Sequence, residues 1–373
     1  MSNILLHSVV PQNEKATYSQ GDQIDFLIDF PGRKLIPGSV RLEALCETEK
    51  SAGVANDTNF LQLDNQAGAH CFIDSVTTEM ANLGVVETIN SDYARYVKMK
   101  TQASVSKADL NTSRYVPEWR ASERRTSSLR LRNKVNINKT AATQVNFKND
   151  FSIKPDICLN NLEGGNLSYL KSGYCKVSFT LARDLNVLMG PAQVAGSNYE
   201  LSNLRLKFQS IPEDNMNNNL VMNTIYVIKQ GIQSSSANIS SKVPSVCKGV
   251  VGSFLKQSSD NAIRVNGHAT NLPPSMAEIR FLFNDASNNL LTYSLRNIND
   301  QILKGSKALG GGEGVGNQLT PSDRGANDGY LFGVNFDKNV NLTNTKFNAQ
   351  FDSAIASTVP YNCYLYFMGV VSL

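Results

Sequence analysis

Histidines are the first residues to test for catalysis in this sequence, because few other side chains act as general bases near neutral pH. The chain has only three, His7, His70 and His268, and they are far apart in the sequence. The Gly-x-Ser-x-Gly motif, which forms the nucleophile turn of many serine hydrolases, does not occur. We therefore expect no histidine-centred catalytic triad.

Two other pairs of residues could in principle bind a metal or transfer protons. His70 and Cys71 are adjacent, and adjacent residues of a strand point to opposite faces, which disfavours a shared zinc ion. Glu47 and Glu49 could serve a glycosidase, but nothing in the sequence sets the separation of carboxylates that this chemistry demands. We expect no catalytic residue, no cofactor and no metal, so the sequence does not predict an enzyme.

A glycine-rich stretch, GGGEGVG at residues 310–316, resembles a phosphate-binding loop, because backbone amides can surround an anion. The Gly-Lys-Ser/Thr ending that such loops require is missing, and turn-forming polar residues follow as far as residue 329. We interpret residues 310–329 as a long exposed loop between two strands. Gly311 and Gly312 at its start are candidate contacts with a neighbouring subunit.

Residues 114–139 contain a cluster of basic side chains with few opposing carboxylates. It could contact nucleic acid, an anionic membrane or an acidic neighbouring subunit, or it could be a solvated insertion loop. Among the binding roles we favour a subunit contact, for which the candidates are Arg124, Arg125, Arg130 and Arg132. The segment has few apolar residues, so it could become ordered only on assembly.

Composition limits the remaining possibilities. The 373 residues are 41% hydrophobic and carry a net charge of +4, which supports folded cores but no broad basic face for nucleic acid. We expect no sequence-specific nucleic acid binding. The N-terminus lacks the pattern of a signal peptide, and no apolar run approaches the ~18 residues of a spanning helix. The six dispersed cysteines are typical of buried free thiols in a reducing compartment.

Alternation of apolar and polar residues is the strongest local pattern, and it is typical of half-buried strands. It recurs at residues 24–30, 40–44, 175–181, 204–208, 279–283 and 330–336. The final segment, 361–373, is almost continuously apolar and aromatic, which indicates a strand buried at the centre of a sheet.

Helical patterns are few. Residues 72–80 could form about two turns, and Asp92 could cap a helix over residues 93–100. Short strands separated by Asn, Gly and Pro predict an all-β fold of sandwiches or barrels.

The length favours two globular units of about 220 and 140 residues, each long enough for an eight-stranded sandwich. The polar segments 211–220 and 231–241 place the linker between residues 212 and 240. The predicted organisation is an N-terminal arm at 1–17, a first unit at 18–230 and a second unit at 231–373.

The order of these segments resembles that of double jelly-roll major capsid proteins from virophages and polinton-like viruses. The resemblance spans most of the chain and rests on patterned segments instead of one sharp motif. These segments are DSVTTEMANLGVVETINSDYARYVKMK at 74–100, FSIKPDICLNN at 151, GYCKVSFTLARDLNVLMG at 173, YELSNLRLKF at 199, SSSANISSKVPSVCKGVVGSF at 234–254, LFGVNFDKNVNLTNTKFNAQFDSA at 331 and YNCYLYFMGVVSL at 361.

The resemblance implies two tandem eight-stranded jelly-roll β-sandwiches with short helices in inter-strand insertions. It also implies a structural role in the virion of a DNA virus. Three chains would form a pseudo-hexagonal homotrimer, and the trimers would tile an icosahedral shell assembled in the host cell. Implied partners are further copies of the chain, penton and minor capsid proteins, and an internal membrane reached through the N-terminal arm.

Two other functions stay open on the sequence. One is a vertex (penton) or minor capsid protein with a single jelly roll and an insertion, which would form pentamers. The other is a carbohydrate-binding β-sandwich module with exposed aromatic residues along a shallow site. The single Trp and the absence of a signal-peptide pattern argue against the second.

Overall fold

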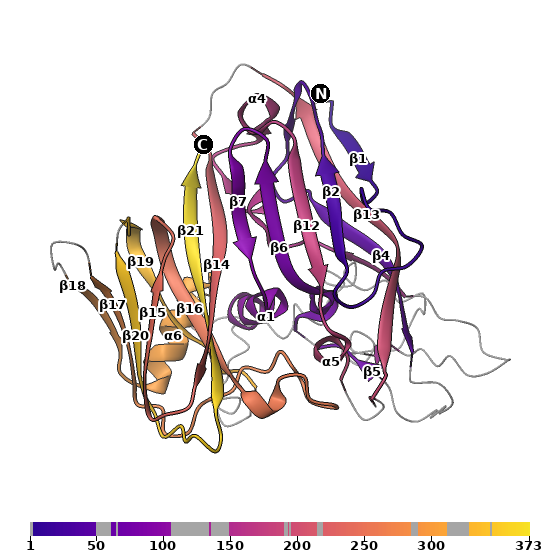
Figure 1. Ribbon diagram of the computed structural model, residues 1–373. Helices are drawn as coiled ribbons and strands as arrows, with labels where there is room; N and C mark the ends of the chain where they lie inside the picture. Colours follow the sequence, from indigo (N-terminus) through magenta and orange to yellow (C-terminus); the bar gives the residue numbers. More distant parts are fainter. Residues whose placement is uncertain are drawn as a thin grey trace.

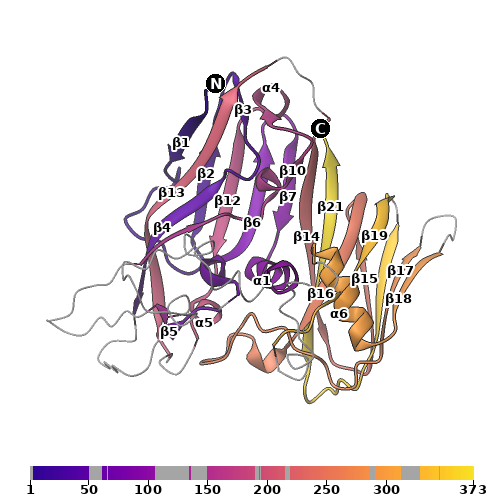
Figure 2. The same cartoon turned by 180° about the vertical axis from the view of Figure 1, so that it is seen from behind.

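The structure is a computed structural model that describes residues 3–49, 61–64, 66–105, 134–135, 149–189, 193, 195–214, 219–284, 290–311, 328–343 and 345–373. Within these residues the chain forms two β-sandwiches that stand side by side (Figure 1). Seen from behind, helix α1 (Tyr93–Ser104) lies in the middle of the molecule and helix α6 (Ile298–Ala308) lies in front of the second sandwich (Figure 2).

The first sandwich has two sheets with four principal strands each. One sheet contains β7 (Gly84–Ile89), β6 (Ile73–Met80), β12 (Cys175–Leu181) and β2 (Gln23–Ile28). The other contains β3 (Arg33–Leu35), β13 (Asn198–Pro212), β4 (Arg41–Glu49) and β9 (Asn149–Ile153). Two short strands extend it: β1 (Leu5–Val9) pairs with β13, and β11 (Leu167–Ser168) pairs with β3. A separate two-stranded sheet is formed by β5 (Leu61–Gln62) and β8 (Lys134–Val135).

The second sandwich repeats this plan of four strands on four. One sheet contains β19 (Phe332–Asn341), β16 (Val246–Lys256), β21 (Tyr361–Ser372) and β14 (Val221–Ile232), and β10 (Leu162–Glu163) pairs with β14. The other contains β15 (Ser236–Lys242), β20 (Lys346–Asp352), β17 (Glu278–Asn284) and β18 (Leu290–Leu295). The predicted all-β class, with eight strands in each sandwich, is confirmed.

A single parallel bridge, between Thr88 of β7 and Tyr226 of β14, joins sheets from the two sandwiches. Together they form one sheet of nine strands that runs through both halves of the molecule. The seam of this sheet is therefore a place where the two halves meet through the backbone.

Strand β21 lies between the two hydrophobic cores. Tyr364 and Tyr366 point into the core of the first sandwich, whereas Leu365 and Phe367 point into that of the second. Both edges of β21 are paired as well, with β14 on one side and β16 on the other. The prediction of a buried central strand at the end of the chain is confirmed, and its continuous apolar character follows from having two buried faces.

The predicted helix after Asp92 is confirmed as α1, but Asp92 does not cap it through its side chain. The predicted helix at 72–80 is wrong, because residues 73–80 form the strand β6 (Ile73–Met80). The β-branched residues Ile73, Val76 and Thr78 favour a strand, and β6 is paired on both edges, with β12 and β7.

Helix α6 is absent from the sequence prediction, and it precedes the segment that we interpreted as a loop between two strands. The Asn297 side chain accepts a hydrogen bond from the Asp300 amide at 2.9 Å, and Gly310 with φ +83° follows the last turn. Asn before a helix and Gly after it are typical end signals, so the helix was recognisable from its boundaries.

The remaining helical turns are short: α4 (Tyr169–Ser172), α5 (Asp184–Val187), η1 (Gly68–Phe72), η3 (Cys158–Asn160) and η4 (Gln257–Ser259). No helix in the described part of the chain is long and apolar enough to cross a membrane.

Two predicted boundaries differ from the strand pairing. The segment 1–17, predicted as an arm, contains β1, which pairs with β13. The boundary predicted at residues 230 and 231 falls at the end of β14, which pairs with β21 along its whole length. We propose that the second sandwich begins with β14.

Because β21 supplies side chains to both cores, we expect either face of the strand to control the stability of both sandwiches. Phe367→Ala and Tyr366→Ala should each lower the free energy of unfolding by about 3–5 kcal/mol, the usual cost of such truncations in a core. Urea unfolding followed by circular dichroism would measure it, with exposed Val359→Ala as the control. Separate transitions for the two sandwiches in either variant would contradict a shared strand.

Candidate functional site

Most of the predicted subunit-contact residues lie outside the described part of the chain, namely Arg124, Arg125, Arg130, Arg132 and Gly312. Gly311 is described, and its amide donates to the Ser306 carbonyl at 2.8 Å. A Cβ atom at this position would lie 2.5 Å from the Ala103 carbonyl oxygen. Gly311 therefore packs the end of α6 closely against the end of α1, and its role as a subunit contact stays a prediction.

The residues first considered for catalysis have ordinary structural surroundings. His70 and Cys71 both lie in the buried turn η1, where His70 Nδ1 is 3.0 Å from the Tyr93 hydroxyl. Burial lowers the pKa of His70 to about 4 and raises the pKa of the Cys71 thiol, so both side chains are neutral near pH 7. Glu47 is buried in β4, and the side chain of Glu49 is outside the described part.

All six cysteines are buried and free, in agreement with the prediction of buried thiols. Among the residues that the structure describes, no group of three or more His, Cys, Asp or Glu side chains could hold a metal ion.

Buried charges gather instead at the junction of the two sandwiches, on helix α1. The Lys98 side chain is fully buried, and its Nζ lies 2.7 Å from carboxylate oxygens of both Asp64 and Asp328. Burial opposes the charged form, but the two carboxylates outweigh it and raise the pKa of Lys98. Asp64 follows β5 in the first half and Asp328 precedes β19 in the second, so one ammonium group ties distant segments together.

The second sandwich completes this site through the segment that follows η4. Asn266 Nδ2 donates to Asp64 at 2.6 Å, and the Thr270 amide donates to Asp328 at 3.0 Å. Although burial alone would raise it, the attraction of Lys98 lowers the pKa of Asp64. The three charges are thus held by direct hydrogen bonds from both halves of the chain, as buried ions require.

Arg95, one turn earlier on α1, makes the second link between the sandwiches. Its guanidinium donates to the carbonyl oxygens of Ala269 at 2.5 Å and Gly267 at 2.7 Å. Its carbon Cζ lies 4.1 Å from the centre of the Tyr364 ring on β21, a cation–π contact. Arg95 therefore joins α1 both to the loop after η4 and to the shared strand.

Lys229 of β14 closes the rim of the junction. Its Nζ lies 3.4 Å from Asp260, 3.7 Å from Asp92 and 5.1 Å from the centre of the Tyr364 ring. Burial opposes the charge of Lys229, but Asp92, Tyr364 and Asp260 together outweigh it and raise the pKa of this side chain. Asp92, which we expected to cap α1, uses its carboxylate for these cations instead.

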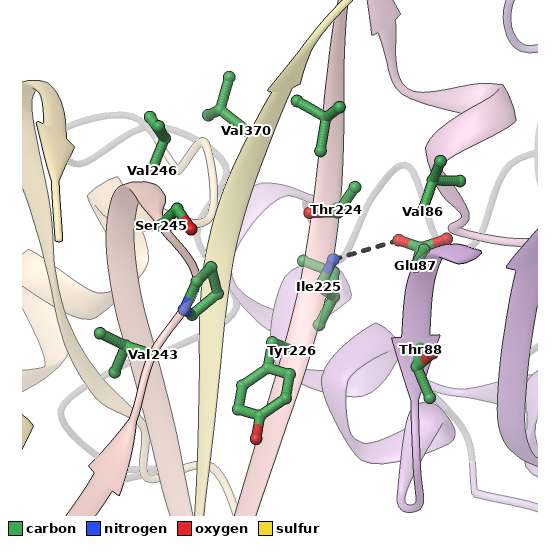
Figure 3. A pocket seen from close by; sticks show the side chains of 12 residues that line it. Val86, Glu87, Thr88, Thr224, Ile225, Tyr226, Val243, Ser245, Val246 and Val370 are labelled. Carbon is green, nitrogen blue, oxygen red and sulfur yellow. Dashed lines mark hydrogen bonds between the residues drawn. The ribbon is translucent and has the colours of Figure 1, made fainter. Parts of the chain in front are cut away.

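Glu87 fills the seam of the nine-stranded sheet, where β7 and β14 share only one bridge. One carboxylate oxygen accepts from the Ile225 amide at 3.1 Å (Figure 3). The other accepts from the Cys158 amide at 2.8 Å. Burial raises the pKa of Glu87 to about 8. The side chain thus replaces backbone pairing that the diverging strands cannot make.

An open cavity of about 410 Å³ lies along this seam. Val86 and Thr88 line one side, Val370 and Val246 line the other, and Tyr226 lies between them (Figure 3). The lining is largely apolar and holds no group of side chains arranged for nucleophilic or acid–base catalysis among the described residues. The junction is built to hold two sandwiches in a fixed orientation.

Sequence reasoning missed this junction, although one signal was present. Arg95 and Lys98 are spaced by three residues, so they lie on one side of the predicted helix, and the apolar and aromatic residues Tyr93, Tyr96 and Val97 surround them in the sequence. Cations on the buried side of a helix need partners. The partners themselves are distant in the sequence and could not be identified.

Loss of the ammonium group would leave the buried Asp64 carboxylate without its cation and next to the partly exposed carboxylate of Asp328. We expect Lys98→Met to lower the free energy of unfolding by about 3–5 kcal/mol, the range for breaking a buried ion pair. Lys304→Met, which removes an exposed pair with Asp300 on α6, should cost less than about 1 kcal/mol. Equal midpoints of the two variants in urea would refute the importance of the junction.

The shifted pKa values of three buried groups also predict how the free energy of unfolding changes with pH. The folded-state pKa of Glu87 is about 8, above its ordinary 4.5, so its contribution is lost as pH rises from about 4.5 to 8. The pKa values of His70 and His268 are lowered by burial to about 4, from 6.5, so their contribution is lost as pH falls below 6.5. These groups together place the maximum of stability near pH 6.5.

Glu87→Gln should remove the decline above pH 6.5, which is at most about 1.4 kcal/mol per pH unit. The amide can accept only one of the two hydrogen bonds, so we also expect a loss of about 1 kcal/mol at the maximum. Urea unfolding at half-unit steps between pH 4 and 8.5 would measure both effects. A decline of unchanged slope in the variant would exclude Glu87 as its source.

Comparison with known proteins adds a structural likeness over the whole chain. No protein-family model and no curated protein matches the sequence. The structure is similar to the Faustovirus major capsid protein, with 10% identity and a TM-score of 0.65, covering 100% of this chain and 90% of that one. It is also similar to the PBCV-1 virus capsid, with 11% identity and a TM-score of 0.62, covering 100% and 95%.

A third similar structure is that of the Sputnik virophage, with 10% identity and a TM-score of 0.54, covering 99% of this chain and 85% of that chain. The likeness extends across both sandwiches and the junction between them. We conclude that the chain has the double jelly-roll fold found in these viral capsids.

Proposed function

We propose that this chain is a structural major capsid protein that forms the shell of an icosahedral DNA virus. The observation that carries the proposal is the pairing of two eight-stranded sandwiches in one chain, similar over its full length to viral capsid structures. A single jelly roll with an insertion, as in a vertex protein, would not contain the second complete sandwich.

In this proposal, three chains form a homotrimer in which six sandwiches give a pseudo-hexagonal outline. Such an outline allows identical trimers to tile a surface, because each edge of the tile meets an equivalent edge. The trimer must keep its shape when it packs against neighbouring trimers. The shared strand β21 and the cations of α1 support this requirement, since they fix the angle between the two sandwiches.

The work of the protein is therefore self-association in the virion, with no catalytic step and no cofactor. Further partners in the proposal are penton and minor capsid proteins and an internal membrane. Arg124, Arg125, Arg130, Arg132, Gly311 and Gly312 are the proposed subunit contacts. We include no sequence-specific contact with the packaged nucleic acid, because a net charge of +4 does not indicate a basic binding face.

Electron microscopy of the purified full-length chain tests this proposal. We expect threefold particles with a hexagonal outline and two lobes for each subunit, because each chain contributes two sandwiches. Fivefold rings would move the protein to the vertex of a shell. Monomers at every concentration would reject self-association, and a screen of immobilised glycans would then test the carbohydrate-binding alternative.

A further inference from the structure

Strand β1 exposes apolar side chains to an unusual degree. Within seven residues, the exposed fractions are 55% for Ile4, 48% for Leu5, 62% for Leu6 and 45% for Val10. Leu5 and Leu6 are adjacent, so they point to opposite faces of the strand. An apolar surface of this kind marks an interaction site in a soluble protein.

The strand is held firmly in this exposed position. It pairs with β13 over five residue pairs, from Leu5 with Ser210 to Val9 with Leu206. The His7 ring stacks on Phe208 at 4.4 Å between ring centres, and its Nε2 lies 2.7 Å from the Ser210 hydroxyl. A strand anchored through its centre presents Leu5 and Leu6 in a fixed geometry.

Arg33 anchors the start of the strand. Its guanidinium donates to the Asn3 carbonyl at 2.8 Å and to the Ser210 hydroxyl at 2.7 Å. This cation is therefore engaged within the molecule. Residues 3–10 contain no charged side chain of their own.

The outer edge of β1 is open in the described part of the chain, where β13 is its only strand partner. It lies at the side of the first sandwich that faces away from the second sandwich (Figure 1). Natural edge strands are usually protected by charges, prolines or a covering segment, and the stretch from Asn3 to Val10 contains no Asp, Glu, Lys, Arg or Pro. Its free backbone groups match those of another strand.

We propose that β1 is an assembly edge, where a strand from a second copy of this chain pairs with the open backbone and the side chains of that copy pack against Ile4, Leu5, Leu6 and Val10. This inference rests on the proposed function, in which copies of the chain meet around each subunit. The open backbone edge selects a polypeptide over lipid, because only a polypeptide can pair with it. The absence of charge excludes attraction to phosphate groups.

Sedimentation velocity of the full-length chain across a range of concentrations tests the assembly edge. Leu5→Asp combined with Leu6→Asp should weaken the dissociation constant between copies at least 100-fold, because two carboxylates would be buried against an apolar partner. The matched control is Leu303→Asp combined with Val359→Asp, which adds the same charge at positions 45% and 47% exposed. This control should associate like the parent chain.

Hydrogen exchange of the unmodified chain gives a second readout that does not depend on the folding of a variant. The amides of Leu5–Val9 that do not bond to β13 should exchange at least tenfold more slowly in the oligomer than in the dilute monomer. Unchanged exchange on association, or equal association of both double variants, would overturn the assembly edge and leave the proposed function standing. A parent chain that never associates would instead overturn the proposed function.

Discussion

The structure depends on one constraint: from Tyr361 to Gly369, strand β21 is buried on both faces and paired on both edges. Alternate side chains, such as Tyr366 and Phe367, belong to different cores, and the strands on both sides complete its hydrogen bonds. The core of the first sandwich is therefore closed by side chains of the second, such as Val251, Leu331 and Tyr366. Two jelly rolls joined only by a linker would move independently, whereas a common strand makes their relative position part of the folding equilibrium.

The charged junction has a different role from that of the cores. Apolar packing tolerates small rotations, but Lys98 needs Asp64 and Asp328 at hydrogen-bond distance at the same time. A buried ion network of this kind is weak evidence for stability, because desolvation offsets much of the attraction. The network instead favours one angle between the sandwiches, because other angles would leave buried charges without partners.

The sequence allowed the fold to be predicted wherever a strand had one buried face. The alternation at residues 24–30 or 175–181 survives in any context, because the period of two is a property of the strand itself. The prediction of a helix at residues 72–80 was wrong because the spacing of their apolar residues also fits a helix. Pairing with the neighbouring strands β12 and β7 makes this segment a strand. Helix α6 was missed although Asn297 and Gly310 mark its ends.

The junction could not be predicted, since Lys98 and Asp328 are brought together only by the completed fold. The burial of all six thiols has a practical consequence for studies of motion. A thiol reagent cannot reach any of them while both sandwiches stay closed, so the native chain offers a silent background for chemical labelling. One cysteine introduced at the surface would carry a single dye or spin label. Slow labelling of the native thiols would then report how often each sandwich opens.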